Sequence, residues 1–216
     1  MTPSWLLSQW QELAPPIKIL TLLVVGVVVL SLPAIIYASV VNAHEKHFLK
    51  SSSGQPLHWL PVSLPITALF DTDFPTEYSV AYKIVALETN AVVRRQVLDR
   101  IGCTWLMDPV ILHSNDVPKH HVYITAGAVN TTFGQTTLHH HPAGNIDACF
   151  IDIPQGLREN ALLTAVRHEL GHCLGLQHSN DVNSPMYPTI RHNDAHLSKP
   201  FTSADIQHLR WAYDKK

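Results

Sequence analysis

The sequence predicts an α+β domain over residues 61–216, preceded by an apolar segment over residues 19–41. After residue 61, segments with strand patterns and segments with helix patterns follow one another in mixed order, which is typical of α+β domains. Residues 19–41 contain no charged side chain, although charged residues make up 15% of the chain. The 216 residues allow one domain large enough to bury a core, together with an accessory segment.

The apolar segment is long enough to cross a bilayer as a helix, because about 20 residues span the hydrocarbon core. We expect a tail over residues 1–18, a transmembrane anchor or signal sequence over residues 19–41, and a Ser-, Gly- and Pro-containing linker over residues 42–60. An anchor is favoured because the run is longer than the apolar part of a signal peptide. It would hold the domain at a membrane, outside the cytoplasm. Cleavage after Ala43, which would give a secreted domain, is the alternative.

The first elements of the domain are predicted from their residue patterns. Leu64–Phe70 is rich in residues that favour strands. Glu77–Ile101 is predicted to be a helix, because apolar residues recur along it at helical spacing: Ile84, Leu87, Ala91, Leu98 and Ile101.

Four further strands and two helices are predicted after that helix. The strands are Thr104–Met107, His121–Ala126, Gln135–His140 and Asp147–Ile153. The helices are Leu157–Gly175 and a C-terminal helix through Tyr213, which begins at Thr202 with a pattern resembling a capping box. A loop rich in Pro and Asn separates the two helices.

Histidine is the unusual feature of the composition. The chain has 15 histidines, as many as Lys and Arg together, and its formal net charge is −2. This balance offers no basic surface, so we expect no nucleic-acid partner. Neutral imidazole is the commonest metal ligand in proteins. The histidines therefore indicate either a polar surface or metal binding, and the sequence distinguishes these only where a motif is present.

Such a motif occupies residues 168–178, which read HELGHCLGLQH. His168 and His172 are four residues apart, so on a helix both imidazoles lie on one face. Gly175 permits the positive φ that a sharp turn requires, and His178 can then return to the same point as a third ligand. Three protein ligands leave one position open for water, which is the arrangement of a catalytic zinc site.

Glu169 directly follows the first ligand and would reach a water at the metal without binding the metal itself. Zinc lowers the pKa of such a water to about 7, and a carboxylate can take its proton as the oxygen attacks a carbonyl group. The sequence therefore predicts one catalytic Zn²⁺ with Glu169 as the general base.

The pattern HExxHxxGxxH is the signature of metzincin proteases, and HELGHCLGLQHS followed by SPMYP resembles the matrixin, or matrix metalloproteinase, branch. The resemblance implies a zinc metalloendopeptidase whose domain has a twisted mixed sheet of about five strands, an active-site helix and a C-terminal helix. It also implies that Met186 lies beneath the zinc and that Tyr187 and Pro188 form a wall of the specificity pocket. Phe133–Pro142 resembles the edge strand along which a protein or peptide substrate lies extended.

The resemblance is less complete around the second half of the sheet. Cys149 stands where matrixins have a histidine that binds a structural zinc, so we do not expect that second zinc. Asp147 and Asp152 are candidates for binding Ca²⁺. Cys173 lies within the motif helix and is expected to be a buried thiol, which leaves a disulfide between Cys103 and Cys149 as the expected bridge and implies an oxidising compartment.

Three other functions have to be weighed against an endopeptidase. The first is a membrane-tethered binding protein with the same fold and no activity, although such a protein would be expected to lack a ligand or the base. The second is a zinc hydrolase of small amides or an exopeptidase, and the predicted edge strand favours internal peptide bonds instead. The third is a histidine-rich module for metal storage or sensing.

Overall fold

The computed structural model describes residues 46–71, 74–99, 103–104, 120–127, 134–157, 159–189 and 198–214, together with residues 31, 33 and 39. The chain divides into two compact units, Met1–Lys46 and His47–Lys216. Apart from three positions, the predicted membrane segment at residues 19–41 lies outside the described residues. No helix among the residues described is both long enough and apolar enough to cross a membrane.

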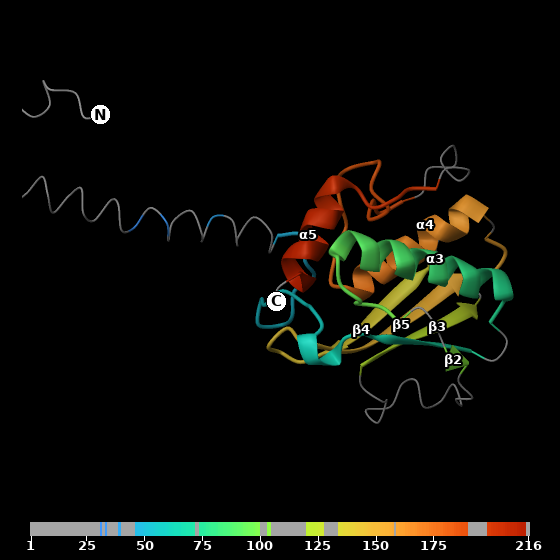
Figure 1. Cartoon of the computed structure of the whole chain (residues 1–216), viewed down its shortest axis with the longest axis horizontal. Helices are drawn as coiled ribbons and strands as arrows, with labels where there is room; N and C mark the ends of the chain where they lie inside the picture. Colours follow the sequence, from blue (N-terminus) through green and yellow to red (C-terminus); the bar gives the residue numbers. More distant parts are fainter. Residues whose placement is uncertain are drawn as a thin grey trace, which may run out of the picture. The chain divides into compact units, whose positions relative to one another are not determined.

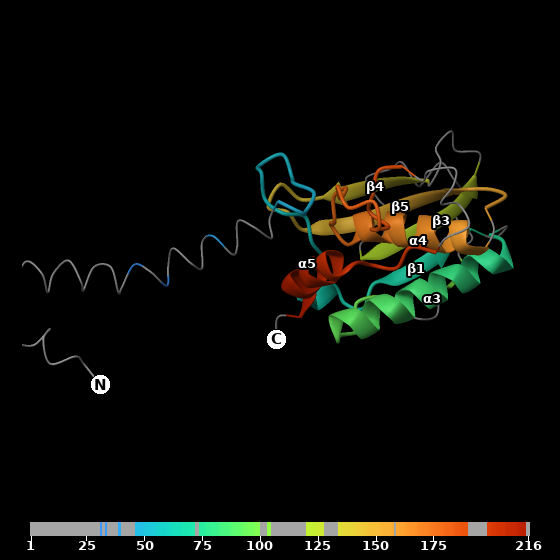
Figure 2. The ribbon, with the colours of Figure 1, turned by 90° about the horizontal axis from the view of Figure 1, so that it is seen from above.

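The second unit is built on a five-stranded sheet with the order β2-β1-β3-β5-β4. The strands are β1 (Thr67–Phe70), β2 (Cys103–Thr104), β3 (His121–Gly127), β4 (Gln135–His140) and β5 (Ile146–Pro154). Strand β4 is antiparallel to β5, and the other pairs are parallel. Helices α3 (Thr76–Val93) and α4 (Glu159–Cys173) pack on one face of the sheet, and α5 (Ser203–Tyr213) follows near the C-terminus (Figures 1 and 2). This arrangement confirms the predicted α+β domain with its mixed sheet.

Helix α3 differs from its prediction in length and in the face that it buries. It ends at Val93, because Arg94 adopts a left-handed conformation with φ of 61°. The part of the predicted apolar stripe that lies within α3 faces solvent, with Ile84 39% and Leu87 48% exposed, whereas Leu98, beyond the end of the helix, is buried. The buried face carries Tyr78, Ala81, Tyr82, Val85, Ala86, Thr89, Asn90 and Val93. The helix is apolar on both faces, so its periodicity identifies a helix without identifying the side that joins the core.

Residues 47–60 form part of the domain, where the sequence predicts a linker as far as residue 60. In this N-terminal arm (residues 47–60), Phe48, Leu57 and Trp59 are at most 3% exposed. The Ser- and Gly-containing stretch is a turn, closed by the amide of Ser51, which donates to the carbonyl of Gln55 at 2.9 Å. The apolar residues on either side of the turn supply core packing, so the compact unit begins at His47.

The disulfide joins Cys149 of β5 to Cys173 of α4, with Cα atoms 5.6 Å apart. The predicted pairing of Cys103 with Cys149 is therefore wrong. Cys103 lies on β2, and two strands separate β2 from β5. Three strand spacings amount to about 14 Å, whereas a disulfide requires Cα atoms within about 7 Å. Cys173 is instead held against β5 by the helix, and both cysteines are fully buried.

Candidate active site

The three motif histidines converge at one point. His168 and His172 come from α4, and their Nε2 atoms are 3.1 Å apart. The ring of His178 lies 5.3 Å from that of His168 and 4.9 Å from that of His172, measured between centroids. One ligand atom from each residue lies within 4.8 Å of the others. Among the described residues, no other group of three or more His, Cys, Asp or Glu side chains converges in this way.

Hydrogen bonds set the tautomers of the two helical histidines. Nδ1 of His168 lies 2.7 Å from the carbonyl of Pro185, and Nδ1 of His172 lies 2.8 Å from the carbonyl of Leu176. A carbonyl oxygen can only accept, so each Nδ1 carries the proton and each Nε2 presents a lone pair. Two such lone pairs at 3.1 Å repel one another unless a cation lies between them.

This donor set fits zinc. Zn–N bonds of about 2.0–2.1 Å with tetrahedral angles place two ligand nitrogens about 3.3 Å apart, close to the observed separation. Burial, together with the neighbouring His172, lowers the pKa of His168 to about 3. Burial likewise lowers the pKa of His172 to about 4. Both imidazoles are therefore neutral near pH 7, as metal ligands must be.

The turn between the second and third histidines requires glycine for two reasons. Gly175 has φ of 90°, which side-chain-bearing residues rarely adopt. A Cβ at this position would also overlap the carbonyl oxygen of Leu57 in the N-terminal arm. The arm is bonded to the turn on both sides: the amide of Leu49 donates to Gly175 at 2.7 Å, and the amide of Gln177 donates to His47 at 3.0 Å. The motif predicts the positive φ, but it does not predict this contact.

Met186 packs against the helix that carries the first two histidines and is fully buried. A Cβ at Gly171, between the two helical histidines, would overlap its sulfur. The amide of Met186 donates to Ser184 Oγ at 2.9 Å, and that hydroxyl donates to Asp205 Oδ2 of α5 at 2.8 Å. The C-terminal helix thus supports the methionine.

The two residues after the methionine are near the surface. Tyr187 is half-buried and Pro188 is exposed.

Glu169 is only 2% exposed and is held by the sheet. Burial, with a smaller contribution from the charge of Asp152, outweighs the lowering effect of the hydrogen bond from Thr136 and raises the pKa of its carboxyl group to about 7. Thr136 belongs to β4, and its hydroxyl donates to Glu169 Oε2 at 2.6 Å. No sequence pattern singles out this threonine, since nothing local links β4 to α4. A base with a pKa near the working pH is suited to proton transfer.

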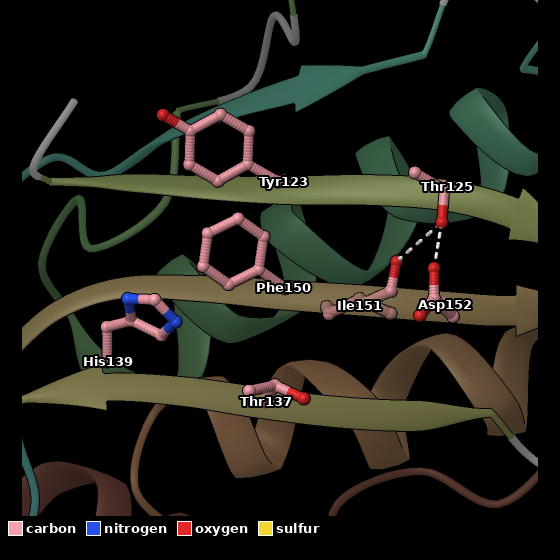
Figure 3. A pocket seen from close by; sticks show the side chains of 7 residues that line it. All are labelled: Tyr123, Thr125, Thr137, His139, Phe150, Ile151 and Asp152. Carbon is pink, nitrogen blue, oxygen red and sulfur yellow. Dashed lines mark hydrogen bonds between the residues drawn. The ribbon is translucent and has the colours of Figure 1, made fainter. Parts of the chain in front are cut away.

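A cavity of about 340 Å³ opens on the other face of the sheet. Figure 3 shows the rings of Tyr123 and Phe150 side by side on this face, stacked with their centroids 4.8 Å apart. None of the three histidines and no part of Glu169 lines it. Asp152 lies here and accepts a hydrogen bond from Thr125. Neither Asp147 nor Asp152 belongs to a group of potential metal ligands among the described residues.

Comparisons with known proteins agree with this geometry. The matrixin family model matches residues 77–214. Matrilysin from Felis catus is 44% identical over 62 residues, which are 29% of this chain and 23% of matrilysin. Stromelysin-2 from Rattus norvegicus is 35% identical over 86 residues, covering 37% of this chain and 18% of stromelysin-2. These matches therefore span about a fifth of the length of either relative.

A solved structure supports the fold. Archaemetzincin from Methanopyrus kandleri superimposes with a TM-score of 0.50 at 14% identity, covering 71% of this chain and 97% of that one. At this identity the likeness concerns the fold alone. The family match covers well over half of the chain and includes every residue of the histidine site. The chain belongs to the matrixin family.

Proposed function

We propose that this protein is a zinc-dependent endopeptidase in which His168, His172 and His178 hold the metal and Glu169 is the general base. The observation that carries the proposal is the convergence of the three histidines, with two Nε2 atoms at a zinc-compatible spacing, beside a buried carboxyl group. When bound, zinc would activate a water and polarise the scissile carbonyl group. Glu169 would accept the proton of that water and return it to the leaving amine.

The sheet supports an extended peptide as the substrate. Among the described residues, β4 pairs only with β5, so its outer edge can accept a further strand through main-chain hydrogen bonds. From the resemblance to matrixins, a peptide substrate would lie extended along this edge, which favours cleavage of internal bonds. From the resemblance to matrixins, Tyr187 and Pro188 would form a wall of the pocket for one substrate side chain.

We further propose that the domain works outside the cytoplasm, either anchored through residues 19–41 or released after Ala43. The uncharged run at residues 19–41 supports an export signal or an anchor. The buried Cys149–Cys173 disulfide supports an oxidising compartment.

Substitution of the base tests the proposal. The full-length chain with Glu169→Gln should retain one zinc per chain but cleave peptides at least about a hundredfold more slowly. Glu77→Gln, an exposed glutamate at the start of α3, provides the same change away from the site and should have no effect. Sequencing of the products separates the enzyme classes, because release of single terminal residues would indicate an exopeptidase. A wild-type protein that binds zinc and peptide without cleavage would indicate the non-catalytic alternative.

A further inference from the structure

Strand β4 contacts the catalytic base directly. Thr136 Oγ1 lies 2.6 Å from Oε2 of Glu169 and 3.2 Å from the main-chain oxygen of the same residue. Two residues earlier, Gly134 approaches so closely that a Cβ there would lie 3.1 Å from both Cγ and Oε1 of Glu169. The side chain of the base is thus enclosed by one end of the strand beside which a substrate is expected to lie.

We propose that Thr136 is a positioning residue that holds the Glu169 carboxylate in its working orientation. Its hydrogen bond fixes the position of the carboxylate relative to β4, the strand along which the substrate is expected to bind. The inference rests on the proposed endopeptidase function. A glutamate side chain loses rotamer freedom when it is fixed, and a hydrogen bond to its charged carboxylate offsets that loss. Because Thr136 occupies Oε2, the other oxygen is left to take the proton.

Thr136 also joins β4 to α4, so a purely structural role has to be distinguished from positioning. A structural link would change stability or zinc retention. It would leave the turnover of each folded, zinc-loaded molecule unchanged. Positioning through Glu169 predicts a change in kcat that disappears when the carboxylate is already absent.

The test compares Thr136→Val, which keeps the shape and removes the hydroxyl, with Thr136→Ser, which keeps the hydroxyl. Thr89→Val is the matched control, because Thr89 is a fully buried threonine of α3 whose hydroxyl donates to the carbonyl of Val85. Each variant is made in the full-length chain and assayed for zinc content, thermal midpoint, kcat and KM on a peptide that the wild-type protein cleaves.

We expect Thr136→Val to lower kcat per zinc-loaded molecule by about ten- to a hundredfold, with KM changed less than about twofold. Thr136→Ser should stay within about threefold of the wild type, and Thr89→Val should be unchanged. In the Glu169→Gln background, Thr136→Val should lower the residual rate no further. The inference is overturned if Thr136→Val matches Thr89→Val, if the serine variant is as slow as the valine variant, or if the two substitutions are additive. A wild-type chain without cleavage would instead refute the proposed function.

Discussion

Cys149 and Cys173 join strand β5, which lies next to the edge strand β4, to the last residue of helix α4, one position after the proposed metal ligand His172. The bridge closes a loop with a sequence separation of 24 residues, which contains His168 and Glu169 as well as His172. It therefore fixes the end of the helix that carries His168 and His172 on the sheet that includes the proposed substrate-binding edge.

Removal of this bridge should destabilise the domain. The variant with both Cys149→Ala and Cys173→Ala is expected to lose about 2–4 kcal/mol of unfolding free energy, since a disulfide limits the conformations of the unfolded chain. Urea unfolding of the oxidised wild type and of the double variant measures the difference. Digestion without reduction should yield a linked peptide pair containing Cys149 and Cys173, and a linked peptide containing Cys103 would contradict the assignment.

The close approach of Gly175 to the carbonyl oxygen of Leu57 predicts that Gly175→Ala destabilises the domain more than a positive φ alone would explain. Gly175→Ala should lower both the unfolding free energy and zinc retention, because the new Cβ would push the N-terminal arm away from the turn before His178. Gly156→Ala is the control: Gly156 has φ of 85°, but a Cβ added there would meet no atom within 4 Å. The control should cost about 1 kcal/mol. Equal losses in chemical denaturation of the two variants would argue against the contact with the arm.

The N-terminal arm should contribute to stability as a core element. Phe48→Ala removes a side chain that is 1% exposed, and such substitutions typically cost about 3–5 kcal/mol. Val62→Ala, at a position 86% exposed, should leave the unfolding free energy within about 0.5 kcal/mol of the wild type. Denaturant titrations of the full-length variants provide the measurement. A Phe48→Ala protein as stable as the Val62→Ala protein would mean that the arm acts as a linker after all.

Zinc should stabilise the folded domain through all three histidines. Binding to the native state alone raises its stability by RT ln(1 + [L]/Kd), about 2.7 kcal/mol at a hundredfold excess over Kd. Titration of zinc into chelator-treated protein should therefore raise the thermal midpoint of the wild type. The rise should be much smaller for His178→Ala, whereas His141→Ala, in the exposed β4–β5 turn, should respond like the wild type. An undiminished rise in the His178→Ala variant would remove His178 from the ligand set.

The parts of the site that are local in sequence could be predicted, and the parts made by distant segments could not. His168, His172 and His178 follow from helix geometry and one turn, and the structure brings them together. The partner of Cys173 depends on strand order, because Cys103 and Cys149 sit on strands separated by two others. Thr136 reaches Glu169 across 33 residues of sequence, and no spacing rule connects them.

The same distinction applies to the fold. Periodicity and turn residues predict the order of strands and helices. They do not predict the role of residues 47–60, because Ser, Gly and Pro between Phe48 and Trp59 form a turn here and would equally suit a flexible connection. Only the burial of the two aromatic residues, which tertiary packing decides, separates these possibilities.

The contact between Gly171 and Met186 limits how far the histidine motif can be transplanted. Gly171 is one of the positions that the motif leaves unspecified, yet a Cβ there would overlap the sulfur of the methionine that follows 15 residues later, which would have to move. A protein designer who grafts only residues 168–178 onto an unrelated helix would obtain the three histidines without Met186, the buried side chain that packs against the helix between the first two of them. A usable transplant would have to carry Met186 and its support from α5 as well.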